Sequence, residues 1–117
     1  MNLLLDTQIY RWAAGNSPRL RAHARELVQA ADEVYVSAAS IWEACIIAEL
    51  ARSIPASGFA ELPVLALHAL KVAALPPIHR DPFGRLLVAQ AESAGLHLLT
   101  ADAILGGYSP RVIAVPS

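Results

Sequence analysis

Three acidic side chains stand where a sheet-based site would collect them. Asp6 directly follows one short apolar run, Asp102 follows a second, and Glu43 lies in the first turns of a predicted helix after a third. Ligands of open parallel sheets bind beyond the carboxyl ends of the strands, so we expect these carboxylates to converge at one edge. Carboxylates at close range repel one another unless protons or a cation neutralise them. Hard oxygen ligands suit Mg²⁺ or Mn²⁺, so the pattern predicts a divalent-metal site.

A metal ion held in this way activates water and stabilises the charge that develops on a phosphoryl group, so the expected reaction is hydrolysis of a phosphodiester. Asp6 is then a metal ligand, and Glu43 and Asp102 complete the shell directly or through water. Each acid also has a purely structural interpretation: Asp6 in a turn with Thr7, Glu43 in a capping box with Ser40, and Asp102 as an ordinary turn residue. The residues alone leave both interpretations open.

A fourth acid, Asp81, precedes Pro82. This dipeptide is typical of a helix start, with aspartate at the cap and proline at the first position, so a pure N-cap is the favoured interpretation. Arg80 and Arg85 flank this start, where a phosphate-facing role and a solvated helix end are equally compatible with the sequence. The four histidines are scattered among different elements without metal-ligand spacing, so we expect them in solvent or core positions.

The hydrophobic pattern predicts alternating strands and helices. Strands are expected over Leu3–Leu5, Val34–Val36, Leu96–Leu99 and Val112–Val115. Helices are expected over Arg19–Ala31 after a Ser17-Pro18 start, over Ser40–Leu50 after a Ser40–Glu43 capping box, over Leu65–Ala73, and from Asp81 to Ala94 with Gly95 as the stop. This order predicts an α/β fold, a mostly parallel sheet of four to five strands with helices on both faces, in a single domain over residues 1–117.

The composition is that of a chain that builds a core, with 56% hydrophobic and 16% charged residues. So high an apolar fraction hints at a second buried face, such as an oligomer or partner interface. A formal net charge of −1 gives no whole-chain sign of a nucleic-acid partner. The chain reaches Asp6 too early for a signal peptide and has no apolar run long enough to span a membrane, so we expect no membrane partner and a cytoplasmic protein. The lone cysteine, Cys45, excludes an internal disulfide and a cysteine-based zinc site.

Four sequence blocks follow one another along nearly the whole chain. They are Leu-Leu-Leu-Asp-Thr from Leu3 together with Trp12, Val-Ser-Ala-Ala-Ser-Ile-Trp-Glu over 36–43, His-Arg-Asp-Pro-Phe from His79 with Arg-Leu-Leu-Val-Ala-Gln-Ala from Arg85, and Leu-Leu-Thr-Ala-Asp ending at Asp102. Together they resemble PIN-domain proteins of the VapC toxin type. The resemblance implies a PIN-like fold and a Mg²⁺- or Mn²⁺-dependent endoribonuclease that cleaves RNA as the toxin of a type II toxin–antitoxin pair. It also implies a homodimer and a small antitoxin that covers the active site, and it matches the family's first, second and fourth acids to Asp6, Glu43 and Asp102.

The third acid of the family is missing at its usual place. Relatives of this sub-type usually have Asp-Pro-Phe-Asp-Arg here, and the second aspartate of that segment, the catalytic one, corresponds to Gly84. Asp81 survives one helical turn earlier, while Gln8 stands where histidine is frequent and Ile47 where lysine is frequent. Loss of a carboxylate should lower metal affinity, so we expect weak nuclease activity that rises in Gly84→Asp, with Asp81 as the source of any remaining catalytic carboxylate. The alternative is a catalytically silent PIN-fold module that binds an antitoxin or another protein.

A phosphoaspartyl protein is a third class that the sequence disfavours. Phosphatases of the haloacid-dehalogenase type have a second aspartate two residues after the first, where this chain has Gln8. These phosphatases and response-regulator receivers both use a lysine near the phosphate. The only lysine here, Lys71, lies in a predicted helical stretch outside the acidic cluster.

Overall fold

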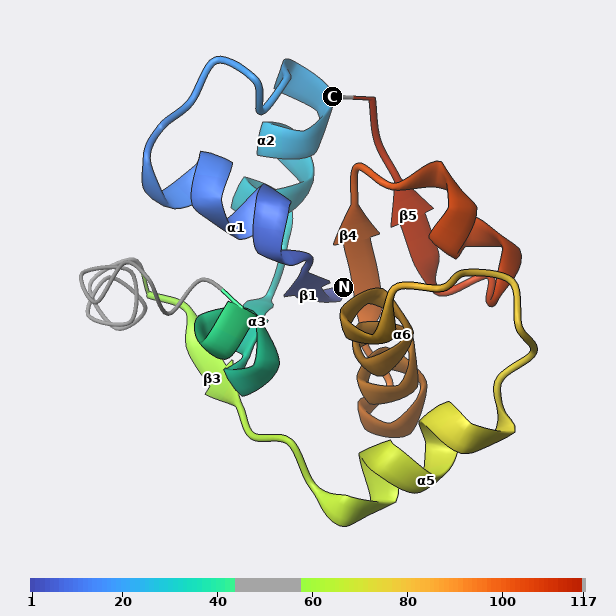
Figure 1. Ribbon diagram of the computed structural model, residues 1–117. Coiled ribbons are helices and arrows are strands. Elements are labelled where there is room, and N and C mark those ends of the chain that lie inside the picture. Colours follow the sequence, from blue (N-terminus) through green and yellow to red (C-terminus); the bar gives the residue numbers. More distant parts are fainter. Residues whose placement is uncertain (44–57, 117) are drawn as a thin grey trace.

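The fold is a five-stranded sheet in the order β3-β2-β1-β4-β5, with every neighbouring pair parallel (Figure 1). The computed structural model describes residues 1–43 and 58–116. The strands are β1 (Asn2–Leu5), β2 (Glu33–Ser37), β3 (Ala60–Leu62), β4 (His97–Thr100) and β5 (Val112–Ala114). The helices are α1 (Thr7–Ala14), α2 (Ala22–Ala30), α3 (Ala38–Glu43), α5 (Ala66–Ala74), α6 (Pro82–Ala94) and the 3₁₀ helix η1 (Ala103–Gly107). The predicted α/β fold is confirmed.

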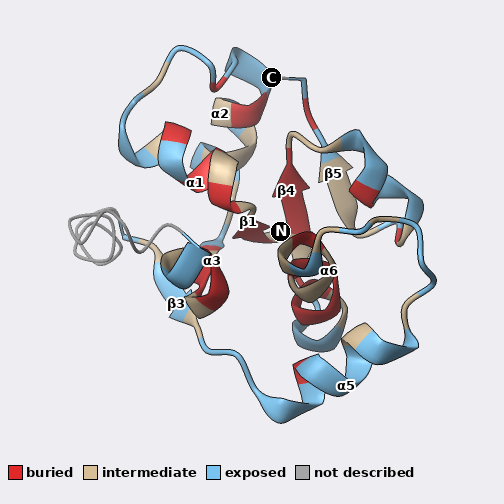
Figure 2. Cartoon of the chain, viewed as in Figure 1, coloured by how far each residue is buried: buried red, intermediate tan, exposed pale blue. Residues whose placement is uncertain are grey.

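The central strand β1 is buried on both faces, as its continuous apolar run requires. Leu3 and Leu5 belong to a cluster with residues of α1 and α2, whereas Leu4 packs with residues of α6. Figure 2 shows the buried residues concentrated in β1, β4 and α6, while α5 is mostly exposed. Helices α1 and α2 cover one face of the sheet, and α6 covers the other. Helix α5 packs against α6.

The register of β1 and β4 brings their carboxyl ends to the same height. Leu5 pairs with Leu99, and the backbone N–H of Asp6 donates to the Leu99 carbonyl oxygen at 2.9 Å. Asp6 is the residue after β1, and Asp102 comes two residues after the end of β4. Adjacent parallel strands therefore deliver two aspartates to one edge of the sheet.

The predicted helix over Arg19–Ala31 starts too early, because α2 begins only at Ala22. The reason is the guanidinium of Arg25, which donates to the Leu20 carbonyl oxygen at 2.7 Å, to the Ser17 carbonyl oxygen, and to Asn16 Oδ1 at 2.9 Å. These bonds, which reach back five to nine residues along the chain, fix the segment before α2 as a turn and override the local Ser-Pro signal.

The predicted helix start at Ser40 is also wrong, because α3 begins at the end of β2 without a loop between them. Ser37 acts near the cap, its Oγ accepting the backbone N–H of Ala39 at 3.0 Å. Ser40 lies inside α3, where its buried hydroxyl accepts a hydrogen bond from Thr7 Oγ1 at 2.8 Å. The capping box between Ser40 and Glu43 is therefore absent, and the hydroxyl pair joins α3 to α1.

The other elements follow the sequence more closely. The predicted helix over Leu65–Ala73 is found as α5, and α6 starts and stops as predicted, with Asp81 at its N-cap and Gly95 in the left-handed region at φ 69°. Helix α1 and strand β3 have no counterpart in the sequence prediction, and β3 consists of only three residues, two of them exposed. Residues 44–57, which include Cys45, Ile47 and the second half of the predicted helix over Ser40–Leu50, lie outside the described part. None of the described helices is long and apolar enough to cross a membrane.

Candidate active site

Two carboxylates meet at the edge of the sheet through one buried threonine. Asp6 is the N-cap of α1, and its Oδ1 accepts the backbone N–H of Thr7 at 2.7 Å. Its Oδ2 accepts a hydrogen bond from Thr100 Oγ1 at 2.5 Å. The Thr100 Oγ1 atom in turn accepts the backbone N–H of Asp102 at 3.0 Å. Thr100 is fully buried at the end of β4, so its hydroxyl joins the loops that carry the two acids.

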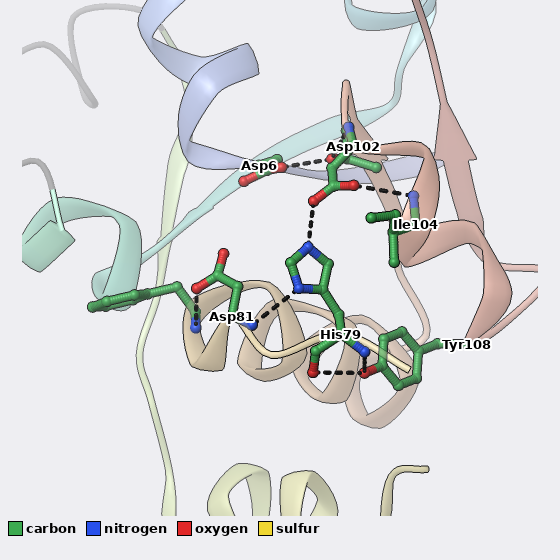
Figure 3. Close-up of polar contacts among 8 residues, drawn as sticks. Asp6, His79, Asp81, Asp102, Ile104 and Tyr108 are labelled. Atoms are coloured by element: carbon green, nitrogen blue, oxygen red, sulfur yellow. Dashed lines mark hydrogen bonds and ion pairs between the residues drawn. The ribbon is translucent and has the colours of Figure 1, made fainter. Parts of the chain in front are cut away.

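Asp102 is the N-cap of η1 and is held from two sides (Figure 3). Its Oδ1 accepts the backbone N–H of Ile104 at 3.0 Å, and its Oδ2 lies 2.7 Å from His79 Nε2. His79 Nδ1 accepts the backbone N–H of Asp81 at 3.0 Å, so in the neutral ring the proton sits on Nε2. His79 therefore donates to Asp102 and connects it to the start of α6.

The two carboxylate oxygens of Asp81 differ in their contacts. Its Oδ1 caps α6 by accepting the backbone N–H of Phe83 at 3.0 Å. Its Oδ2 lies 3.5 Å from the point where a Cβ on Gly84 would stand. Within the described residues this oxygen has no hydrogen-bond partner. The carboxylate of Asp81 thus lies beside the space that a side chain at position 84 would enter.

A cavity of about 360 Å³ brings Asp6, Glu43 and Asp81 together. Glu43, the last described residue of α3, is exposed and lines this cavity with Phe83 of α6. The ring of Phe83 lies against that of Trp42, with centroids 5.3 Å apart, which fixes the end of α3 against the start of α6. All four predicted acids therefore border the region around Asp6.

Comparison with known proteins identifies the family. The family model named PIN domain matches residues 3–107. The chain belongs to the PIN domain family. Several solved structures share its fold. A toxin-antitoxin complex from Klebsiella pneumoniae matches with a TM-score of 0.74 and 20% identity, over 96% of this chain and 96% of that one.

The second structure is VapBC2 from Rickettsia felis bound to a DNA fragment from its promoter, with a TM-score of 0.70 and 13% identity, over 99% of this chain and 98% of that one. The third is FitAcB from Neisseria gonorrhoeae, with a TM-score of 0.63 and 16% identity, over 88% of this chain and 89% of that one. At these identities the likeness is one of fold. No curated protein sequence matches the chain.

The acids of this PIN domain interact electrostatically. Burial raises the pKa of Asp6 above its ordinary 3.8, and the negative charges of Glu43 and Asp102 raise it further. The hydrogen bonds from Thr100 and Thr7 favour the charged form and act in the opposite direction, but they do not reverse the shift. The ionised site is therefore unfavourable by itself, and a cation beside Asp6 would relieve it.

The donor set of this PIN domain fits a hard cation, with a restriction on how many side chains bind it directly. Carboxylate oxygens are the preferred ligands of Mg²⁺ and Mn²⁺. Across residues 1–43 and 58–116, no three His, Cys, Asp or Glu side chains are close enough to hold one ion together. The arrangement suits the usual Mg²⁺ mode, in which one or two carboxylates bind directly and waters complete the shell.

Sequence reasoning found the acids but missed the residues that orient them. His79, expected in a solvent or core position, bonds to Asp102, and its place two residues before the cap of α6 was the only local signal. Thr100 stands in the fourth block of the PIN resemblance, but the sequence assigned it no role. Arg85, considered for a phosphate contact, instead binds the end of α5, donating to the carbonyl oxygens of Val72 at 3.1 Å and Leu75 at 3.3 Å.

Replacing Asp6 by asparagine is expected to stabilise the metal-free protein at neutral pH. A raised pKa means that the folded state favours the protonated acid. The stability this provides is complete below the unfolded value near 3.8 and is lost as pH rises through the folded pKa. Asp6→Asn removes the charge, so we expect its Tm to exceed that of the native chain by a few °C at pH 7, with the gap closing towards pH 3.

Asp32→Asn is the matched control, because the N-terminal ammonium at 2.6 Å lowers the pKa of Asp32. Asparagine there should leave Tm unchanged or slightly lower at pH 7. A Tm for Asp6→Asn that stays below the native value across the pH range would contradict the assignment of electrostatic strain to Asp6.

His79→Phe is expected to weaken Mn²⁺ binding by about 10- to 100-fold, the usual cost of losing an outer-shell partner of a metal ligand. Phenylalanine keeps a ring but leaves Asp102 Oδ2 and the Asp81 N–H without their partner. Electron paramagnetic resonance of free Mn²⁺ measures the affinity, and His23→Phe, at an exposed position of α2, is the control. Equal affinities in the two variants would exclude this role for His79.

Proposed function

We propose that this PIN domain is a Mg²⁺- or Mn²⁺-dependent endoribonuclease, the toxin of a VapC-type toxin–antitoxin pair in the cytoplasm. PIN domains are generally nucleases. The observation that carries the proposal is the pair of Asp6 and Asp102, joined by the Thr100 hydroxyl at the carboxyl edge of the sheet. Glu43 and Asp81 add two carboxylates to the cavity that Asp6 lines, which supports a site able to bind a cation and a phosphodiester together.

The proposed roles follow from the contacts of each side chain. Asp6 and Asp102 would hold the cation, with Glu43 and Asp81 acting through water. A bound divalent cation supplies an activated water and positive charge for the phosphoryl group under attack. Thr100 fixes Asp6 Oδ2, and the Nε2–H of His79 fixes Asp102 Oδ2. These bonds orient both ligands before the substrate arrives, so little reorganisation is needed during the reaction.

The substitution at Gly84 favours low activity and supports a second candidate function. Only Asp81 offers a carboxylate at the start of α6, and one of its oxygens already caps the helix. If Asp81 does not serve as the third acid, the chain is a catalytically silent PIN module that binds an antitoxin or another protein. Both candidate functions assume the same fold. They differ in whether Asp81 serves as the third acid in the absence of a carboxylate at position 84.

Exposed apolar residues support a protein partner in either case. Leu70 and Leu67 of α5 are 74% and 51% exposed, and Trp42 at the end of α3 is 68% exposed. Apolar surface of this kind is frequent where proteins associate. One of the similar structures is a toxin-antitoxin complex, which supports an antitoxin as one partner, and we propose a homodimer as the second association.

Removing either central aspartate is expected to abolish cleavage. In an assay of Mn²⁺-dependent cleavage of a structured RNA, we expect Asp6→Asn and Asp102→Asn to lower the rate by at least about 100-fold, more than an outer-shell substitution costs. Glu61→Gln, which removes an equal charge from the exposed edge strand β3, is the control and should cleave normally. Cleavage that persists in Asp6→Asn would exclude the proposed site.

Gly84→Asp is expected to raise both Mn²⁺ affinity and the cleavage rate, by about tenfold or more, because it adds a carboxylate beside Asp81. The variant should also lose about 1–3 kcal/mol of stability from overpacking, since a Cβ there would stand 3.0 Å and 3.3 Å from the Leu105 methyl carbons. Denaturant titration and the cleavage assay measure the two effects separately.

Gly84→Ala is the matched control, because it makes the same contact with Leu105 without a charge. Equal activity in Gly84→Ala and Gly84→Asp would show that the carboxylate is not the cause. Asp81→Asn keeps the helix cap and removes the charge. It should reduce the activity of the native chain if Asp81 serves as the third acid, whereas silence of the native chain together with rescue by Gly84→Asp would establish a disarmed toxin.

A further inference from the structure

A second, larger cavity of about 1010 Å³ opens beside the acids and is lined by three segments of chain. The end of β1 and helix α1 contribute Asp6 and Trp12, and the start of η1 contributes Asp102 and Ile104. The third segment is the turn before α2, which contributes Arg19 and Arg21 and carries no acid. Two carboxylates and two guanidinium groups thus border one cavity.

The fold uses one arginine of this region and leaves the two cavity arginines available. The guanidinium of Arg25 is engaged in the turn, where it donates to the Leu20 carbonyl oxygen at 2.7 Å and to Asn16 Oδ1 at 2.9 Å. The side chains of Arg19 and Arg21 are exposed and have no hydrogen bond or ion pair within the part of the chain that the structure describes. Arg25 therefore holds in place a turn that presents two uncommitted guanidinium groups to the cavity.

The chemistry of the lining changes from one wall to another. The carboxylates of Asp6 and Asp102 suit a phosphate that is bound through a cation. Ile104, 54% exposed, offers apolar surface for the sugar and base, whereas Trp12, which also lines the cavity, is 8% exposed and belongs to the core. Arg19 and Arg21 suit a second phosphate directly, because the guanidinium fork matches phosphate oxygens. A strand of nucleic acid carries the same kinds of group, phosphates separated by nucleosides.

We propose that this cavity binds single-stranded RNA beside the cleavage site, and that Arg19 and Arg21 bind a backbone phosphate next to the one that is cleaved. The inference rests on the proposed function, since it takes the acids as the place of cleavage. An acidic peptide would also bind two arginines, but it gives no role to the carboxylates in the same cavity. RNA accounts for both kinds of charged residue in the cavity. One phosphate binds the carboxylates through a cation, and a second phosphate binds the arginines directly.

The test measures RNA binding without catalysis. A short fluorescein-labelled single-stranded RNA is titrated in EDTA, by fluorescence anisotropy, over roughly 50 to 200 mM salt. In the double variant Arg19→Gln/Arg21→Gln, we expect the slope of log affinity against log salt to fall by about 0.7, because one phosphate contact on a single strand contributes about that much. Affinity should fall roughly tenfold at the lowest salt.

Two control variants separate phosphate binding from general charge and from folding. Arg111→Gln removes one positive charge just before β5, at the amino end of the sheet and away from the cavity, and should leave the slope unchanged. Arg19→Lys/Arg21→Lys keeps both charges and should restore the slope. Far-UV circular dichroism confirms that each variant is folded. An unchanged slope in the glutamine double variant, or an equal loss in Arg111→Gln, would overturn the proposal, as would equal displacement of the RNA by polyglutamate.

The same proteins, assayed for Mn²⁺-dependent cleavage, distinguish this inference from the proposed function. Cleavage by the native chain with an unchanged KM and salt slope in the glutamine double variant would reject the phosphate site and leave the nuclease intact. RNA binding that depends on the two arginines in a chain that cleaves nothing would keep the phosphate site and reject the nuclease. A rise in KM with little change in kcat in the double variant is the result expected when both are correct.

Discussion

The hydroxyl of Thr100 is the contact on which the site depends. Two aspartates at the ends of neighbouring parallel strands would repel each other and turn towards solvent. Thr100 prevents this because it donates to Asp6 and accepts from the backbone N–H of Asp102, so both loops are fixed to one buried atom. The geometry is possible only because β1 and β4 are adjacent and in register, with Leu5 opposite Leu99. Strand order, rather than any single acid, therefore brings the charges together.

The same aspartates also begin helices, so the structural interpretation of each is confirmed and is compatible with the proposed functional one. Asp6 caps α1 and Asp102 caps η1, each accepting a backbone N–H of the turn that follows. A helix N-terminus favours negative charge, which offsets part of the cost of burying a carboxylate. A carboxylate oxygen has more than one lone pair, so a cap can also bind a cation or a water. The capping bonds thus hold the acids at fixed positions and leave each able to bind a further group.

The parts of the fold that the sequence predicted correctly are those with local causes. Asp81 before Pro82 specified the start of α6, and apolar runs specified β1, β2 and β4. The wrong helix starts at Arg19 and Ser40 share one cause, a side-chain hydrogen bond that reaches beyond the neighbouring residues. Arg25 closes the turn before α2, and Thr7 binds the hydroxyl of Ser40, 33 residues away along the chain. For the same reason the acids were recognisable from their positions after strands, whereas Thr100 and His79 became recognisable only once their partners were placed.

The glycine at position 84 is best understood through its neighbours. Its Cα lies against Leu105, whose methyl carbons would stand 3.0 Å and 3.3 Å from any Cβ, and beside Asp81 Oδ2. With a glycine there, Leu105 packs closely on the first turn of α6 and draws η1, which carries Asp102 at its cap, against that helix. An acid at this position would gain a ligand and push Leu105 away. The chain therefore has tighter packing here and one carboxylate fewer than the expected motif. Under the proposed function Asp81, with one oxygen on the helix cap and one uncommitted, decides whether the site cleaves RNA.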